Sequence, residues 1–253
     1  MKKNFLALLA LFLLPFSAGF AQCNPDDQVE SWYSYLKSYG NSGIDYFPIP
    51  ESDEMIVGDS VHLEMSKQFE FVKKYADQAR LDAIISRLSA FVNRKNIRYK
   101  VHVIDDKRTL NAFSVAGGHL YITTKMVEWT ESEDELAFIL AHEMAHVDNK
   151  HGIRKVQIMM LGQTFLGDYG TMAGNIALAV TAPFGQIDEY EADREGAMLA
   201  EKAGYDSKKG LRFFEKMGEK ENYDIVEKIV RTHPYSKERL HCMELFLKDE
   251  YDK

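Results

Sequence analysis

The spacing of apolar residues predicts a chain that is mainly helical. Between about Ser60 and Asn93 apolar residues recur at helical intervals, and their shared stripe is expected to face the core. The stripe consists of Leu81, Ile84, Ile85, Leu88 and Phe91. After Trp129 the pattern is helical nearly to the end of the chain. Breaks are expected at Gly152, near Gly167 and Gly170, at Pro183, at Gly204 and at His233-Pro234.

Between these helical regions the pattern changes to alternation of period two. Ile97–Ile104 alternates as a half-buried strand does, and the polar residues 105–107 turn the chain. Leu110–Val115 and Leu120–Thr123 are expected to pair as a hairpin through Gly117-Gly118. A small sheet inserted between helices predicts one α+β domain.

The N-terminus has the parts of a secretory signal peptide. Lys2 and Lys3 form a basic start, Phe5–Phe16 is apolar apart from one proline, and small residues precede a cleavage position after Ala21. Residues 1–21 are therefore expected to be removed, and the mature protein is expected to be exported. The apolar run is too short to span a bilayer comfortably.

The mature chain is expected to consist of an N-terminal extension, residues 22–52, and one domain, residues 53–253. The extension is polar and interrupted by proline and glycine, as surface segments are. Within the domain, Met172–Phe184 is apolar but too short for a membrane span. It is expected to form a buried or lid-like helix. Contact with a membrane, and so peripheral membrane association, is the alternative, and the oligomeric state is left open.

Cys23 and Cys242 are the only cysteines. In an oxidising compartment they could form one disulfide between the N-terminus and the last helix. An unstructured Cys23 and a packed, unpaired Cys242 is an equal alternative. Lipid attachment at Cys23 is a third, which the preceding Gln22 disfavours.

Composition and charge narrow the function classes. The 253 residues are enough for a substantial core, and 45% hydrophobic with 28% charged residues is ordinary for a globular protein. A net charge of −8 without a Lys/Arg-rich patch argues against a nucleic-acid partner.

Residues 142–146 read H-E-M-A-H and carry the strongest chemical signal. On a helix, His142 and His146 lie about 40° apart, so both imidazoles can reach one metal ion. Glu143 projects from the flank of that face, where its carboxylate can hold a water molecule at the metal. Ser132 and Glu135 provide the N-cap and capping-box residues expected at the start of this helix.

A catalytic zinc site needs a third protein ligand. His151 lies nine residues after His142, about 180° round a continuous helix, and is expected to face away as a helix-end charge or hydrogen-bond donor. The segment 189–193, E-Y-E-A-D, is the better source. Glu189 can bind the metal while Asp193, four residues later, accepts a hydrogen bond from the far N–H of a ligand histidine. Glu191 is expected to be exposed.

Four segments together carry a family resemblance. They are N-A-F-S-V-A-G-G at 111–118, E-L-A-F-I-L-A-H-E at 135–143, E-Y-E-A-D at 189–193, and T-H-P at 232–234 followed by Arg239. In this order and spacing the chain resembles the HtpX-like and CAAX-prenyl-protease-like family of zinc metalloendopeptidases, which are gluzincins. It is most similar to the soluble periplasmic members of the BepA and LoiP type. The likeness covers roughly residues 53–247.

The resemblance implies an exported, periplasmic zinc endopeptidase with a mainly helical gluzincin-type domain. One Zn²⁺ per chain is expected on His142, His146 and Glu189, with Asp193 behind the ligands. Glu143 is expected to act as general base on a zinc-activated water. Expected substrates are unfolded or misassembled proteins, in envelope protein quality control.

The resemblance also assigns His233, Arg239 and a substrate-binding strand. His233 and Arg239 are expected to stabilise the transition state, and an extended substrate is expected to pair with the strand at Asn111, Ala112 and Phe113. An alternative is a latent or chaperone-like zinc protein in which His233 is a fourth ligand; another is an accidental motif. Substrate fit is in question at Ala116, where the family often has proline, and at 186–188, Q-I-D, where an arginine is common.

Overall fold

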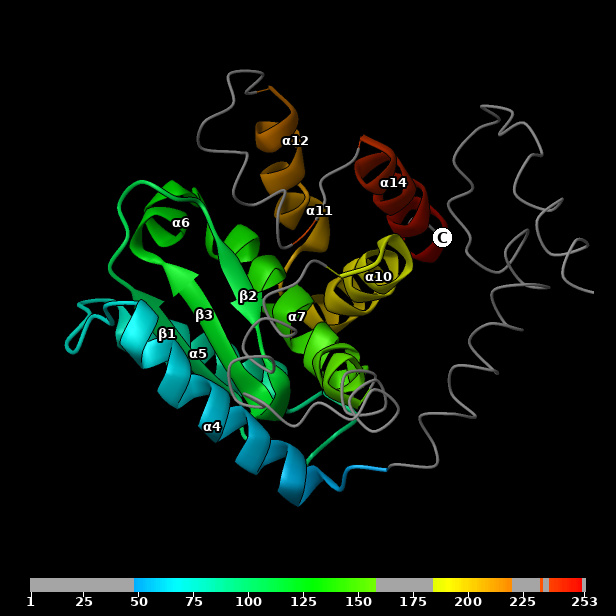
Figure 1. Ribbon diagram of the computed structural model, residues 1–253. Helices are drawn as coiled ribbons and strands as arrows, with labels where there is room; N and C mark the ends of the chain where they lie inside the picture. The colour runs from blue at the N-terminus through cyan, green and yellow to red at the C-terminus, as the bar shows by residue number, and fades with distance from the viewer. Residues whose placement is uncertain (1–47, 158–183, 220–232, 234–236, 252–253) are drawn as a thin grey trace, which may run out of the picture.

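The computed structural model describes residues 48–157, 184–219, 233 and 237–251 (Figure 1). Its helices are α4 (Glu51–Gln68), α5 (Gln78–Ser89), α6 (Thr124–Trp129), α7 (Glu133–Asp148), α10 (Gln186–Lys202), α11 (Ser207–Gly210), α12 (Arg212–Glu219) and α14 (Lys237–Tyr251). Its strands are β1 (Lys100–Ile104), β2 (Ala112–Ser114) and β3 (His119–Thr123), with a 3-10 turn, η2, at Ala116–Gly118. The predicted signal peptide, most of the extension and residues 172–183 lie outside the described residues.

The three strands form one mixed sheet in the order β1-β3-β2, which confirms the α+β prediction. β2 and β3 pair antiparallel as the expected hairpin, and β1 pairs parallel to β3. Alternation along the strands separates the two faces. One face packs on α5 and α7 through Val101, Val103, Leu120 and Ile122. The other face, with Phe113 and Tyr121, packs under α4 (Figure 1).

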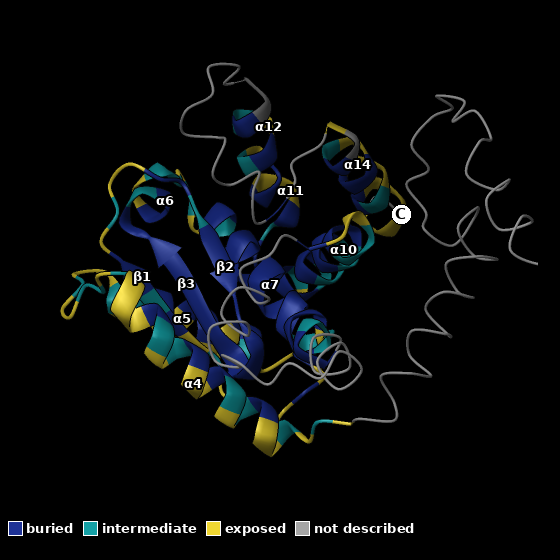
Figure 2. Cartoon of the chain, in the orientation of Figure 1, coloured by how far each residue is buried: buried dark blue, intermediate teal, exposed yellow. Residues whose placement is uncertain are grey.

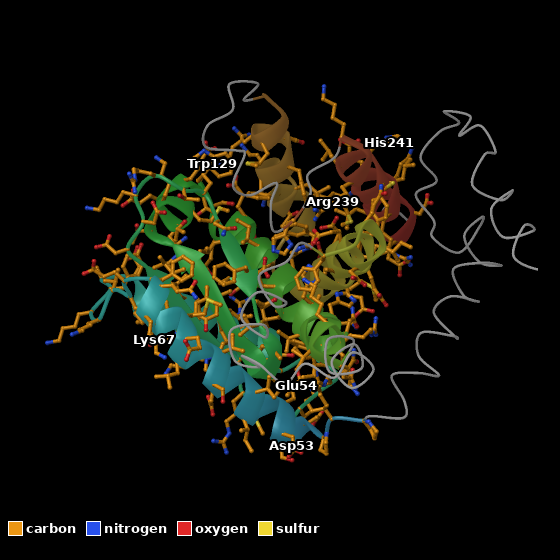
Figure 3. The ribbon with its side chains drawn as sticks, viewed as in Figure 1. Asp53, Glu54, Lys67, Trp129, Arg239 and His241 are labelled. Carbon is orange, nitrogen blue, oxygen red and sulfur yellow. The ribbon has the colours of Figure 1, made fainter. Side chains whose placement is uncertain are left out.

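The buried carboxylate of Glu54 on α4 binds the hairpin turn and, through Arg94, connects it to α7. Gly117 and Gly118 have φ of 80° and 91°, a region that favours glycine, and the Gly117 N–H donates to Glu54 of α4. Arg94 forms an ion pair with Glu54 and also donates to the carbonyl oxygen of Val147 near the end of α7. Figure 3 shows Glu54 on the side of α4 that faces the rest of the protein. This network joins α4, the hairpin and α7.

α7 lies at the centre of the protein and is buried along nearly its whole length (Figure 2). As predicted, Ser132 is its N-cap and accepts a hydrogen bond from the Glu135 N–H. The predicted capping box is not completed, because the Glu135 side chain accepts a hydrogen bond from the Glu131 N–H, one residue before the cap, instead of from the Ser132 N–H. α10 crosses α7 closely at Gly196, where a Cβ atom would lie 2.9 Å from the backbone of His142.

The helical spacing over 60–93 corresponds to two helices, α4 and α5. α4 begins earlier, at Glu51, and ends at Gln68. Phe71 then forms a bridge with Ile104 at the end of β1, so the sheet interrupts the helical pattern. The stripe residues on α5 are buried as predicted, but the prediction for Phe91 is wrong: it is 45% exposed because α5 ends at Ser89.

The helix break predicted at Gly152 is also misplaced. The chain turns at Lys150, whose φ is 62°, and residues 151–157 form a new helix that includes Gly152. The break at Gly204, with φ of 81°, is confirmed. The predicted breaks near Gly167 and Gly170 and at Pro183 lie outside the described residues, as does Pro234 of the break at His233-Pro234.

Cys242 is buried on α14 and is disulfide-bonded. Its expected partner Cys23 lies outside the described residues, so the pairing stays a prediction. Within the described ranges, no helix is both long and apolar enough to cross a membrane.

Candidate metal centre

Three of the predicted ligands converge between α7 and α10. The Nε2 atoms of His142 and His146 lie 3.1 Å apart. The carboxylate oxygens of Glu189 lie 3.6 Å from His142 Nε2 and 3.5 Å from His146 Nε2. All three side chains are buried, Glu189 completely. Spacing of four residues on α7 and one residue on a facing helix therefore brings three ligand groups to one point.

The Nδ1 atoms of His142 and His146, on the far side of each ring from Glu189, contact other side chains. His142 Nδ1 lies 3.0 Å from an oxygen of Asp193, as predicted from the four-residue spacing of Glu189 and Asp193. His146 Nδ1 lies 2.8 Å from His151 Nδ1. A proton on each Nδ1 leaves a lone pair on each Nε2, and these lone pairs face one another and Glu189. Such a set of donors fits a divalent metal ion.

Arg239 holds the two buried carboxylates of α10. Its guanidinium reaches from α14, 2.6 Å from Glu189 and 2.7 Å from Asp193, and only 3% of the residue is exposed (Figure 3). Burial opposes ionisation of Asp193, but Arg239 outweighs it and lowers the pKa of Asp193 to about 2. Burial likewise opposes ionisation of Glu189, while His233 and Arg239 keep its pKa below the usual value. Both carboxylates are therefore charged and available as acceptors.

His233 lies inside the same cluster. Its Nδ1 is 2.9 Å from Glu189 and 3.4 Å from His142 Nε2, and its Nε2 is 3.2 Å from Glu143. Burial lowers the pKa of His233, but the carboxylates of Glu143 and Glu189 more than compensate and raise it. Together with His142, His146 and Glu189, His233 belongs to a four-residue group able to hold one metal ion.

Glu143 faces a pocket beside the cluster. Its Oε1 atom contacts His233, whereas its buried Oε2 atom has no hydrogen-bond partner among the described residues. The pocket is mainly apolar and is lined by Glu143, His233 and a group of apolar side chains from β2, α6, α7 and α12. These apolar residues are Ala112, Met126, Phe138, Ile139, Phe213, Phe214 and Met217. The α12 residues carried no chemical signal in the sequence and were missed.

The placement of the predicted substrate strand is compatible with peptide pairing. Ala112 and Phe113 belong to β2, which is the terminal strand of the sheet, and Asn111 precedes them. Ala112 also lines the pocket beside Glu143. The edge of β2 that faces away from β3 carries no further strand in the described part of the chain.

The expectations that His151 faces away from the cluster and that Glu191 is exposed are wrong, whereas the expected hydrogen-bonding role of His151 is confirmed. Because α7 ends at Asp148 and the chain turns at Lys150, His151 does not continue round α7 but returns beneath His146. Its Nε2 lies 3.2 Å from Glu191, which is half-buried rather than exposed. The resulting chain runs from His146 through His151 to Glu191. His151 is a hydrogen-bond partner of a ligand and is not itself in the ligand cluster.

Phe184 is a further contact that the sequence did not reveal. Its ring stacks on that of His146, with ring centroids 3.9 Å apart. The Nζ atom of Lys155 lies 3.3 Å from the centroid of the same Phe184 ring. Burial lowers the pKa of His146 well below its usual value, and the neighbouring His142 lowers it further. The imidazole is therefore neutral and able to act as a ligand.

Replacing His151 with Ala is expected to weaken metal binding by about 10–100-fold, because partners that orient a ligand histidine have effects of this size. The change removes the acceptor for the His146 Nδ1 proton and leaves that buried group unsatisfied. Metal affinity is measured by competition with a chromophoric chelator. His241→Ala, an exposed histidine on α14, is the matched control, and unchanged affinity in His151→Ala would contradict the anchoring role.

Comparison with known proteins gives a family for this arrangement. Residues 75–244, which include every residue of the metal cluster, match Peptidase family M48. "Beta-barrel assembly-enhancing protease" of Yersinia pestis is 25% identical over 206 residues, covering 74% of this chain and 42% of the relative. "Mitochondrial metalloendopeptidase OMA1" of Schizosaccharomyces pombe is 26% identical over 254 residues, covering 89% and 74%. The same-named protein of Arabidopsis thaliana is 30% identical over 154 residues, covering 57% and 31%.

The chain spans about two fifths of the length of the bacterial relative. The family match, in contrast, extends over well more than half of the chain. The chain therefore belongs to Peptidase family M48.

Proposed function

We propose that the chain is a zinc-dependent metalloendopeptidase that hydrolyses peptide bonds in protein substrates. The observation that carries the proposal is the convergence of three ligand groups with their outer atoms anchored. His142, His146 and Glu189 meet within 3.6 Å, while Asp193 and His151 fix the two imidazoles from behind. Two nitrogens and one carboxylate are a ligand set typical of catalytic zinc, and they leave a fourth position for substrate or water.

Zn²⁺ bound there would lower the pKa of a water molecule towards about 7 and polarise the scissile carbonyl group. Glu143 supplies the proton transfer. The residue lines the pocket and its Oε2 atom has no hydrogen-bond partner among the described residues, so it can take a proton from the attacking water and return it to the leaving amine. Neighbouring apolar side chains limit the water in the pocket and strengthen these electrostatic interactions.

The substrate is proposed to bind as an extended segment along β2. Main-chain hydrogen bonds to an edge strand bind a peptide without requiring a particular sequence. The pocket between Ala112 and Phe213 would accept an apolar side chain next to the cleaved bond. Such a site suits unfolded or misassembled proteins, which expose apolar residues in extended chain.

We further propose that the protein acts outside the cytoplasm, in the periplasm, on envelope proteins. The signal-peptide pattern of residues 1–21 supports export. The name of the relative from Yersinia pestis, "Beta-barrel assembly-enhancing protease", supports a role in protein assembly.

Elemental analysis tests the metal assignment. Protein purified without chelators is expected to contain one zinc ion per chain more than a His142→Ala variant, and to cleave casein only when this zinc is present. His241→Ala is the control and should retain it. Equal zinc contents in the wild-type and His142→Ala proteins, or casein cleavage by fully metal-free protein, would contradict the proposal.

A second candidate function concerns His233 as a latch, meaning a histidine that blocks the fourth metal position in the resting enzyme. Its Nδ1 atom, 2.9 Å from Glu189 and 3.4 Å from His142 Nε2, lies among the ligand atoms rather than beyond them. Its Nε2 atom contacts Glu143 and so also pairs with the carboxylate that is proposed to act as general base. This position favours a closed resting state over a donor aimed into the pocket.

His233→Ala is therefore expected to increase casein cleavage by about 10-fold or more, because a minor open state is commonly populated at about 10% or less. Initial rates at equal zinc content measure the effect. A lower rate than that of the wild-type protein would mean that His233 acts as a donor to the reacting carbonyl group.

A further inference from the structure

Three histidines gather on the side of the sheet that faces away from α7. His102 comes from β1, His119 from β3, and His62 from α4, which covers this face. The parallel register places Lys100 beside His119 and His102 beside Tyr121, so the two strand histidines point to the same face. His62 lies over them, with its ring centroid 4.1 Å from that of His102 and 4.9 Å from that of His119.

One nitrogen of each of two rings is held by an oxygen atom. His119 Nε2 lies 3.0 Å from a carboxylate oxygen of Asp59, and His62 Nδ1 lies 3.0 Å from the hydroxyl oxygen of Tyr121. The second nitrogen of each ring, Nδ1 of His119 and Nε2 of His62, is then the candidate metal ligand. A histidine held by a carboxylate on its far side is the arrangement that orients histidine ligands in metal sites.

The inner nitrogens lie close together. His102 Nε2 and His119 Nδ1 are 2.9 Å apart, and one nitrogen from each of the three rings lies within 4.8 Å of the others. Burial lowers the pKa of His102 to about 3 and also lowers the pKa values of His62 and His119. The rings are therefore neutral near pH 7 and carry the lone pairs that a metal requires.

We propose that His62, His102 and His119 form a second metal site, which binds one Zn²⁺ or a similar nitrogen-preferring divalent ion and fastens α4 to the sheet. Imidazole ligands suit such first-row ions, and three of them leave one position for water. With Zn–N distances of about 2.0–2.1 Å, the nitrogens of one tetrahedral site lie about 3.4 Å apart. Binding would open the 2.9 Å pair slightly and rotate the half-exposed His62 out of the parallel stack.

The site is structural rather than catalytic. Asp59 lies behind His119 and does not flank the open position as Glu143 does in the main cluster. A metal here would join β1 and β3 to α4, the helix whose Glu54 also holds the hairpin turn at Gly117. It would therefore stabilise α4 and β3, the two elements that hold β2 and its turn in place.

The test uses protein in which the main cluster has been disabled. The double variant His142→Ala/His146→Ala is dialysed against Zn²⁺, and bound zinc and the thermal midpoint are measured. We expect one zinc per chain and a higher midpoint with zinc than without. Adding His102→Ala should abolish both effects, whereas adding His241→Ala, an exposed histidine, should leave both.

A milder variant guards against misfolding. In the otherwise wild-type chain, saturating Zn²⁺ is expected to give two ions per chain, and His62→Gln, a change at a half-exposed position, should give one while casein cleavage persists. Two ions per chain in His62→Gln, or no zinc bound by a folded His142→Ala/His146→Ala protein, would overturn the proposal.

Discussion

Glu143→Gln is expected to abolish measurable hydrolysis of casein while zinc remains bound. General base catalysis contributes about 10²–10⁴-fold to a rate, and glutamine cannot accept the proton of the attacking water. The substitution keeps the size of the side chain, so the packing around this residue, which is 2% exposed, should not change. His142, His146 and Glu189 are untouched, and the metal content should equal that of the wild-type protein.

The measurement is the initial rate of casein cleavage at equal zinc content. Glu133→Gln is the matched control, because it makes the same chemical change on the same helix at an exposed position, and its rate should be normal. Cleavage by Glu143→Gln at the wild-type rate would refute the assignment of the general base.

Arg239→Ala is expected to reduce the free energy of unfolding of the metal-free protein by about 3–5 kcal/mol. Removing one partner of a buried ion pair leaves the remaining charge uncompensated, and changes of this size follow. Here one guanidinium serves both Glu189 and Asp193, each 0% exposed. The loss also removes the main group that lowers the pKa of Asp193 and, besides His233, one of the groups that lower the pKa of Glu189, so the variant should bind metal more weakly.

Urea denaturation monitored by circular dichroism gives the free energy of unfolding. Arg212→Ala is the control, since Arg212 forms an exposed pair with Glu131, and such pairs contribute about 0–1 kcal/mol. If the two variants were equally stable, Arg239 would not be the group that compensates the buried carboxylates.

Features that depend on neighbouring residues in the sequence were predictable. The N-cap at Ser132, the shared face of His142 and His146 and the relation of Glu189 to Asp193 all follow from the geometry of a single helix. The hairpin at Gly117 followed from its turn residues.

Features that depend on where a helix ends were not predictable. Assuming that α7 continued beyond Asp148 placed His151 on the wrong side, because Lys150 has no glycine or proline signal for its turn. The prediction that Phe91 lies in the core was wrong for the same reason, because α5 ends before it. The grouping of His62 with His102 was also invisible, because it arises only when α4 packs on the sheet.

The close crossing at Gly196 has a consequence for how the metal centre tolerates sequence change. Because a Cβ atom at this position would meet the His142 backbone at 2.9 Å, the two helices touch main chain to main chain. The separation of Glu189 from the two ligand histidines is therefore set by the backbone rather than by the size of intervening side chains. Substitutions on the outer surface of α10 can accumulate without altering the metal geometry, whereas a side chain at position 196 would force the two helices apart.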